Sequence, residues 1–135
     1  MKNGKHAFPI RIEHHRRPPQ VIRYINRFLD ATCDSSRRSI LELLIPPDGQ
    51  DSRDAYELRA GEIAAILGLA PSTTSEHLHQ LLKLHLVSAR KEGTMVFYRL
   101  RNHHLVLAFH ELLEALETHY NSHDYTSEQH EAEEG

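Results

Sequence analysis

Apolar residues recur at three- and four-residue spacing in several separate segments of the chain, and polar or turn-forming residues divide these segments. Residues 18–33 (PPQVIRYINRFLDATC) begin with prolines, which suit the first turn of a helix, and continue with one apolar face. That face consists of Val21, Ile22, Ile25, Phe28 and Leu29. The spacing predicts a first amphipathic helix.

A second helix is predicted by residues 34–47 (DSSRRSILELLIPP). Asp34 or Ser35 would be its N-cap, and the paired prolines at positions 46 and 47 would end it. The polar segment 48–57 (DGQDSRDAYE) contains turn formers and predicts a loop.

Residues 57–87 (ELRAGEIAAILGLAPSTTSEHLHQLLKLHLV) predict two helices that meet at a tight corner. Gly68 suits the left-handed end of the first helix, and Pro71 suits the first turn of the second. The first helix has a short apolar stripe of Ile63, Ile66 and Leu67. Ala70 would be a poor N-cap for the second helix, whereas Thr73 and Glu76 could form a capping box one turn later.

The second helix of this pair has two different faces. One face is expected to pack against the protein, and it consists of Thr74, Leu78, Leu81 and Leu82. The opposite face is polar, with Thr73, Glu76, Gln80 and Lys83 projecting from it and Ser72 and Ser75 toward its edges. A polar face of this length could lie against a partner.

A hairpin and a long helix are predicted next. Residues 86–100 (LVSARKEGTMVFYRL) hold two β-prone runs joined by a charged RKEG corner with Gly93 at the turn. Residues 103–120 (HHLVLAFHELLEALETHY) then carry a broad apolar stripe, which suggests a partner subunit. The stripe consists of Leu105, Ala108, Phe109, Leu112, Leu113 and Leu116.

Composition restricts the class of protein. The 135 residues fit one domain, and 39% hydrophobic with 26% charged residues is typical of a soluble globular protein. No segment approaches the roughly 18 uninterrupted apolar residues of a membrane span. The N-terminal sequence lacks the apolar core of a secretory signal, and the single cysteine cannot form an internal disulfide. We therefore expect a cytoplasmic protein with no membrane partner.

The net charge of −3 conceals an uneven distribution. Residues 1–38 carry nine Lys or Arg against three acids, and residues 58–101 carry six against three. Residues 102–135 carry eight acids and no Lys or Arg. The basic regions could face a polyanion while the acidic end points away. A solvated acidic tail and a loosely basic arm would give the same distribution of charge. We expect three parts, namely a flexible basic arm (1–17), a folded domain (18–120) and an acidic disordered tail (121–135).

The order helix, corner, helix and hairpin is that of a winged helix-turn-helix, a mainly α fold with a small β-hairpin wing (α+β). In such a fold the second helix enters the major groove of DNA, and its short polar side chains allow close approach. Candidate contacts on this helix are Ser72, Thr73, Ser75 and Gln80, and candidates on the hairpin are Arg90, Lys91 and Thr94.

Residues 67–100 (LGLAPSTTSEHLHQLLKLHLVSARKEGTMVFYRL) resemble the ArsR/SmtB family of bacterial repressors, and DATCDSSRRSILELL resembles the second helix of that family. The resemblance implies a homodimer formed through the first and last helices. It also implies that Ser72, Thr73, Ser75 and Glu76 turn toward DNA, with His77 at a family histidine position. Glu76 departs from the family, because an acid facing phosphates costs Coulomb energy unless it accepts a hydrogen bond from a base.

Metal binding is an open question. The resemblance places a sensor site of the last helix at Asn102, His104, Ala115 and Thr118, where only His104 could act as the family's ligand. A displaced divalent-metal site could use His104, Glu114, Glu117 or His119, or it could pair His110 with Glu114, Glu117 with His103, or His119 with His123. A solvated polar face is the competing interpretation, so no cofactor is assigned.

Cys33 is a candidate redox sensor if Arg37, one turn on, lowers the pKa of its thiol. An inert buried cysteine is the commoner outcome.

Taken together, these features predict a homodimeric repressor that binds an inverted-repeat operator in double-stranded DNA. A metal ion, an oxidant or a small molecule would release it. The alternative is a winged-helix interaction module that has lost DNA binding. An enzyme is disfavoured, because the sequence shows no phosphate loop, nucleophile–base pair or paired-carboxylate cleft.

Overall fold

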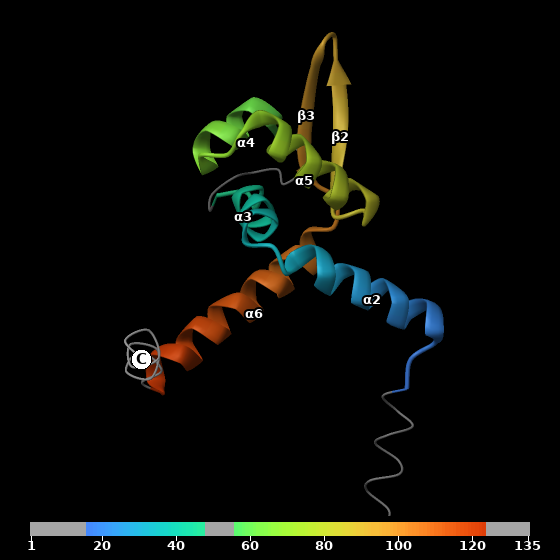
Figure 1. The fold of residues 1–135 in the computed structure, drawn as a ribbon, viewed down its shortest axis with the longest axis vertical. Helices are drawn as coiled ribbons and strands as arrows, with labels where there is room; N and C mark the ends of the chain where they lie inside the picture. Colours follow the sequence, from blue (N-terminus) through green and yellow to red (C-terminus); the bar gives the residue numbers. More distant parts are fainter. Residues whose placement is uncertain (1–15, 48–55, 124–135) are drawn as a thin grey trace, which may run out of the picture.

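The computed structural model describes residues 16–47 and 56–123, and the elements of these residues follow a winged helix-turn-helix order (Figure 1). The mainly helical fold with a small wing is therefore confirmed. In chain order the elements are α2 (Pro19–Thr32), α3 (Ser35–Leu43), β1 (Leu58–Arg59), α4 (Ala60–Leu67), α5 (Pro71–Lys83), β2 (Val87–Glu92), β3 (Met95–Leu100) and α6 (His103–Ser122).

The wing is a three-stranded antiparallel sheet in the order β1-β3-β2. The sequence predicted the hairpin but not β1, because two residues are too few to show an alternating pattern. Leu58 of β1 pairs with Tyr98 of β3, so the chain joins the sheet immediately before α4 begins.

The hairpin turn is tighter than the sequence suggested. Glu92 pairs with Met95, which leaves Gly93 and Thr94 as the loop. Gly93 has φ +65°, and a glycine first in a two-residue loop is the preference of a II′ turn. Arg90 and Lys91 therefore lie within β2 rather than at the corner.

Local sequence explains several helix ends. Asp34 caps α3 by accepting a hydrogen bond from the backbone N–H of Arg37 at 2.9 Å, as predicted. Gly68 ends α4 with φ 69°. Helix α5 begins at Pro71, so the capping box of Thr73 and Glu76 one turn later was a wrong prediction.

Helix α5 ends without a glycine. His85 has φ 61°, and among the non-glycine residues of the described ranges it alone has a left-handed backbone. The N–H of His85 bonds to the carbonyl of Leu82 at 3.0 Å, and the N–H of Leu86 bonds to that of Leu81 at 3.1 Å. These two bonds satisfy carbonyls that the end of the helix would otherwise leave free, which is the Schellman arrangement.

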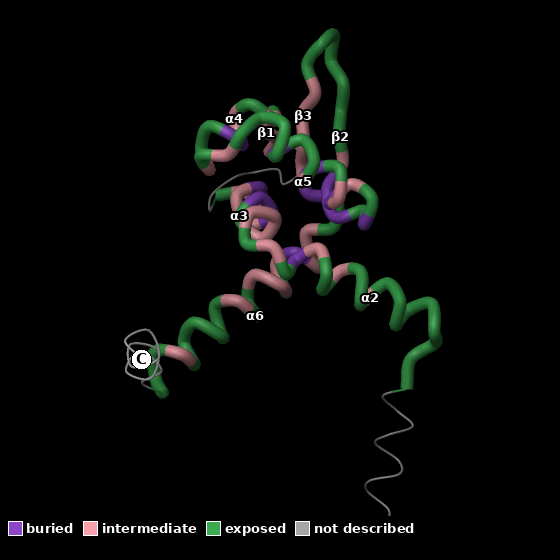
Figure 2. The backbone as a smooth tube through the Cα atoms, in the orientation of Figure 1, coloured by how far each residue is buried: buried purple, intermediate pink, exposed green. Residues whose placement is uncertain are grey.

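The core lies where α3, α4, α5 and the base of the wing meet (Figure 2). Thr74, Leu78 and Leu81 of α5 are buried as predicted, and Thr74 donates its hydroxyl to the carbonyl of Ala70 at 3.0 Å. Ile66 does not follow its predicted stripe, because its side chain is 59% exposed on the outer side of α4. The buried apolar residues are Ile40, Leu41, Leu44, Ile63, Ala64, Leu78, Leu81, Leu84, Leu86, Val87, Leu100 and Val106.

Helices α2 and α6 extend away from this core, and most of their length is exposed (Figures 1 and 2). They contact each other where the rings of Phe28 and Phe109 meet edge to face, with centroids 5.3 Å apart. Their outer faces leave large apolar side chains uncovered, namely Val21, Ile22 and Leu29 of α2 and Leu112 and Leu116 of α6. No helix in the described ranges combines the length and apolar character that a membrane crossing requires.

Candidate nucleic-acid interface

The N-terminal half of α5 presents a continuous polar surface. Ser72, Thr73, Ser75 and Glu76 are exposed, whereas the intervening Thr74 is buried. No side chain caps the start of α5, because Ala70 occupies the N-cap position. The first backbone N–H groups of the helix therefore stay available to an outside acceptor, and a phosphate oxygen is an acceptor of this kind.

The position of Glu76 affects the charge of this surface. Its carboxylate lies on the same exposed side as the serines and the threonine. Phosphates that approached it would be repelled, so a DNA partner would have to offer a donor such as a cytosine amino group. Gln80 is half-buried one turn further along, where its amide can donate or accept.

His77 lies at the side of α5 and faces α3. Its side chain is 13% exposed, with Nε2 3.7 Å from a carboxylate oxygen of Asp34. Its Nδ1 is 3.3 Å from a guanidinium nitrogen of Arg37. The backbone hydrogen bond from Arg37 lowers the pKa of Asp34, and His77 and Arg37 add Coulomb attraction. These contacts favour a bracing role between the helices over the DNA contact that the family position implied.

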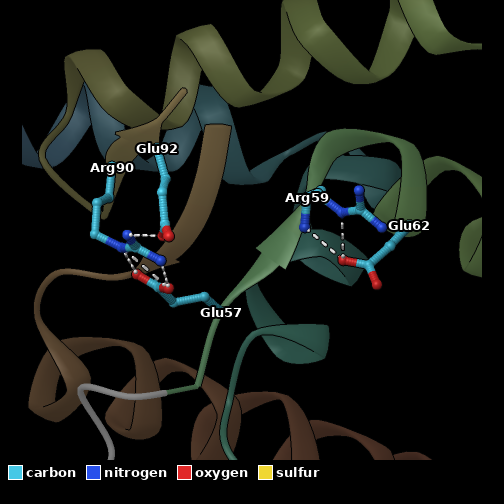
Figure 3. Close-up of polar contacts among 5 residues, drawn as sticks. All are labelled: Glu57, Arg59, Glu62, Arg90 and Glu92. Carbon is cyan, nitrogen blue, oxygen red and sulfur yellow. Dashed lines mark hydrogen bonds and ion pairs between the residues drawn. The ribbon is translucent and has the colours of Figure 1, made fainter. Parts of the chain in front are cut away.

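Ion pairs join β2 to Glu57, the residue directly before β1 (Figure 3). The Arg90 guanidinium donates to Glu57 at 2.8 Å and to Glu92 at 2.7 Å, and it lies 4.7 Å from the centroid of the Phe97 ring. The hydrogen bond from Arg90 lowers the pKa of Glu57, with Coulomb attraction from Arg90 and Arg99 in addition, and the two glutamates raise the pKa of Arg90. Arg90 would therefore have to break its hydrogen bonds with two carboxylates before it could contact a phosphate.

Other wing and corner residues are arranged differently. Lys91 and Thr94 are exposed at the outer part of the hairpin, which is compatible with the predicted contacts. The backbone N–H of Arg59, the N-cap residue of α4, donates a hydrogen bond to the Glu62 carboxylate at 2.8 Å, and the Arg59 guanidinium forms a 3.6 Å ion pair with the same carboxylate (Figure 3).

Sequence reasoning missed Glu57 as a partner of the wing. It was assigned to a loop, and its contact partner Arg90 lies 33 positions away. The strand pairing of β1 with β3 brings the two side chains together. The sequence offers one signal for this contact, namely an acidic residue directly before the β-prone Leu58.

The candidate metal ligands do not converge. His104, Glu114, Glu117 and His119 are all exposed along α6. Within residues 16–47 and 56–123, no three side chains of ligating type gather at one point. His110 does lie near Glu114, at 3.8 Å, but its other ring nitrogen is 2.6 Å from Glu42 of α3. The rings of His119 and His123 are in contact, with centroids 4.0 Å apart and their planes tilted by 36°.

Cys33 is exposed at the junction of α2 and α3, so it is not a buried cysteine. The Arg37 guanidinium is directed to the carbonyl of Ala31 at 2.6 Å and to His77, and neither contact is with the thiol. The redox prediction stays untested.

Three predicted segments lie mostly outside the described residues, and of the predicted loop (48–57) only Tyr56 and Glu57 are described. Of the basic arm (1–17) only Arg16 and Arg17 are described, and of the acidic tail (121–135) only residues 121–123 are described. Helix α6 reaches Ser122, two residues past its predicted end.

Comparison with known proteins shows which proteins this chain resembles. The sequence profile described as "Bacterial regulatory protein, arsR family" matches residues 52–89, a range that contains α4 and α5. The cadmium resistance transcriptional regulatory protein CadC of Listeria innocua serovar 6a is 32% identical over 78 residues, which are 58% of this chain. The chain spans 59% of the length of that relative.

Solved structures agree over more of the chain. A homodimeric winged helix-turn-helix DNA-binding domain from Mycobacterium bovis, described as a possible ArsR-family transcriptional regulator, has a TM-score of 0.65 and 25% identity. The match covers 78% of this chain and 90% of that one. Reduced HlyU from Vibrio cholerae has a TM-score of 0.57 and 33% identity, covering 73% of this chain and 93% of HlyU.

The relatives and the fold they share are those of transcriptional regulators and not of enzymes. The matched profile contains the helix pair whose exposed face forms the candidate interface. The chain therefore belongs to the arsR family of bacterial regulatory proteins.

Proposed function

We propose that this protein is a transcriptional repressor that binds an inverted-repeat operator in double-stranded DNA as a homodimer. The observation that supports this most is the division of α5 into two sides. Thr74, Leu78 and Leu81 fix the helix to the core, while Ser72, Thr73 and Ser75 stay exposed. A helix fixed on one side and polar on the other can enter a major groove about 12 Å wide.

Dimerisation would follow from the uncovered faces of α2 and α6. Val21, Ile22 and Leu29 are 43%, 45% and 55% exposed, and Leu112 and Leu116 are 52% and 55% exposed. Removing such side chains from water favours association by about 25 cal/mol per Å² of apolar area. A two-fold axis through these helices would place two copies of α5 on the same DNA.

A gel-shift titration with DNA that contains the promoter of the protein's own gene tests the proposal. We expect a complex whose affinity falls steeply with salt, because Lys and Arg side chains displace counterions from phosphates. If no complex forms at low salt, the repressor proposal is wrong. If a complex forms, metal ions, peroxide and small molecules are screened for those that release it, because the sequence does not identify the inducer.

Ser75 is the residue with which sequence selectivity can be tested. Ser75→Ala is expected to change the ranking of single-base operator variants by about 1 kcal/mol at the contacted position, because a hydroxyl that reads a base edge is lost. Binding to a panel of operator variants measures this. The matched control is Ser39→Ala, an exposed serine of α3. A uniform change across all variants would show that Ser75 contacts phosphate instead.

A second candidate function is a protein-interaction module on the same scaffold. Two observations favour it, namely the acid Glu76 on the exposed side of α5 and the pairing of Arg90 with two glutamates. Binding to random-sequence duplex DNA at low salt separates the two functions, because an adaptor without a DNA surface would show almost no salt-dependent affinity.

A further inference from the structure

A small basic cavity lies where α2, α3 and the C-terminal half of α5 meet. It has a volume of about 250 Å³. Its polar lining consists of Arg27 and Asp30 of α2, Arg37 of α3, and Gln80 and Lys83 of α5. The same three helices adjoin one another in Figure 1. The predicted DNA contacts do not account for this cavity, which shares only Gln80 with them.

The charges around the cavity are unbalanced. Three cations face one carboxylate, and no ion pair within 4.0 Å joins Arg27, Lys83 or Asp30 to another described residue. Positive charges held close together repel, so an anion that entered would gain Coulomb energy from all three.

The walls of the cavity are held in place before any ligand arrives. Arg37 donates from Nε to the carbonyl of Ala31 at 2.6 Å, and its Nη1 lies 3.3 Å from Nδ1 of His77. Neither contact uses Nη2. The hydroxyl of Tyr24 donates to the carbonyl of Leu84 at 2.9 Å, which fixes α2 against the end of α5. A guanidinium held in this way loses little entropy when it binds an oxyanion.

We propose that this cavity binds a phosphate group. Guanidinium, ammonium and amide N–H groups are donors that phosphate oxygens accept, and Arg27, Arg37, Lys83 and Gln80 provide all three kinds. The volume suits a phosphate with a few additional atoms and is below the usual range for larger ligands. The phosphate could belong to a free phosphomonoester or to the backbone of bound DNA. The DNA source alone rests on the proposed function.

The first experiment uses the full chain without DNA. Inorganic phosphate and glycerol 3-phosphate are titrated at constant ionic strength, with chloride as the reference, and the side-chain N–H signals of Gln80 and Arg37 are followed by NMR. Arg27→Gln and Lys83→Gln are each expected to weaken binding about tenfold. Asp30→Asn is expected to tighten it, which no folding defect would produce. Arg23→Gln, on the same helix but outside the cavity lining, is the matched control and should leave binding unchanged.

The second experiment measures the salt dependence of DNA binding. If DNA supplies the phosphate, Arg27→Gln and Lys83→Gln each lower the slope of log affinity against log salt by about one relative to Arg23→Gln. If free phosphate binds and these variants weaken it, a phosphomonoester is the source. Equal behaviour of all variants in both experiments overturns the proposal. A wild-type protein that binds no DNA refutes only the proposed function, because the first experiment still decides what the cavity binds.

Discussion

At the scale of single residues, the backbone of His85 sets the exit from α5. Its φ of 61° lies in the left-handed region, where a side chain branched at Cβ is strained. We expect His85→Val to lower the free energy of unfolding by about 1–2 kcal/mol in urea denaturation. His85→Gly is the control, because it removes the 3.2 Å contact between the His85 ring and Arg101 without straining the backbone. If valine and glycine destabilise equally, the lost contact with Arg101 and not the backbone explains the effect.

At the scale of elements, the pairing of β1 with β3 and the ion pair of Arg90 with Glu57 attach the segment that leads into α4 to the hairpin. Contact with Arg90 lowers the pKa of Glu57, so this carboxylate stabilises the fold above its ordinary pKa of 4.5, and the stabilisation is lost as the pH falls through the lowered value. We expect Glu57→Gln to lower the unfolding free energy at neutral pH and to match the wild type in strong acid, measured by denaturant titration at several pH values. The control is Glu111→Gln, on the exposed side of α6. A pH-independent difference between Glu57→Gln and the wild type would contradict this role.

At the scale of the whole molecule, the proposed dimer would form through the uncovered apolar faces of α2 and α6. Leu116→Arg is expected to weaken the proposed dimer at least about tenfold, because the arginine replaces a leucine that association would bury. Sedimentation equilibrium measures the dissociation constant, and circular dichroism verifies that the helices persist. Ile66→Arg is the control, since Ile66 is 59% exposed but lies on α4. If both variants dissociate alike, or neither does, α6 is not the interface.

The sequence predicted those features that depend on local chemistry. Gly68 and Gly93 end a helix and turn a hairpin with positive φ, and Asp34 caps α3, all as expected from residue type and position. The missed features depend on contacts between distant residues. The pairing of Glu57 with Arg90 and the contact of His77 with Asp34 arise only when separate elements pack, and no periodic pattern marks them. The same limit applies to the basic cavity, because its lining comes from three helices.

The short strand β1 has a mechanical consequence for regulation. Because Arg59 ends this strand and Ala60 begins α4, no loop residue separates the wing from the helix pair, and we expect a tilt of the wing to move α4 with it. An inducer of the proposed repressor would therefore act on the separation or relative rotation of two intact DNA-reading units, one per subunit. A single pair of spin labels, with one label on each wing tip, would then follow the complete transition between the bound and released states.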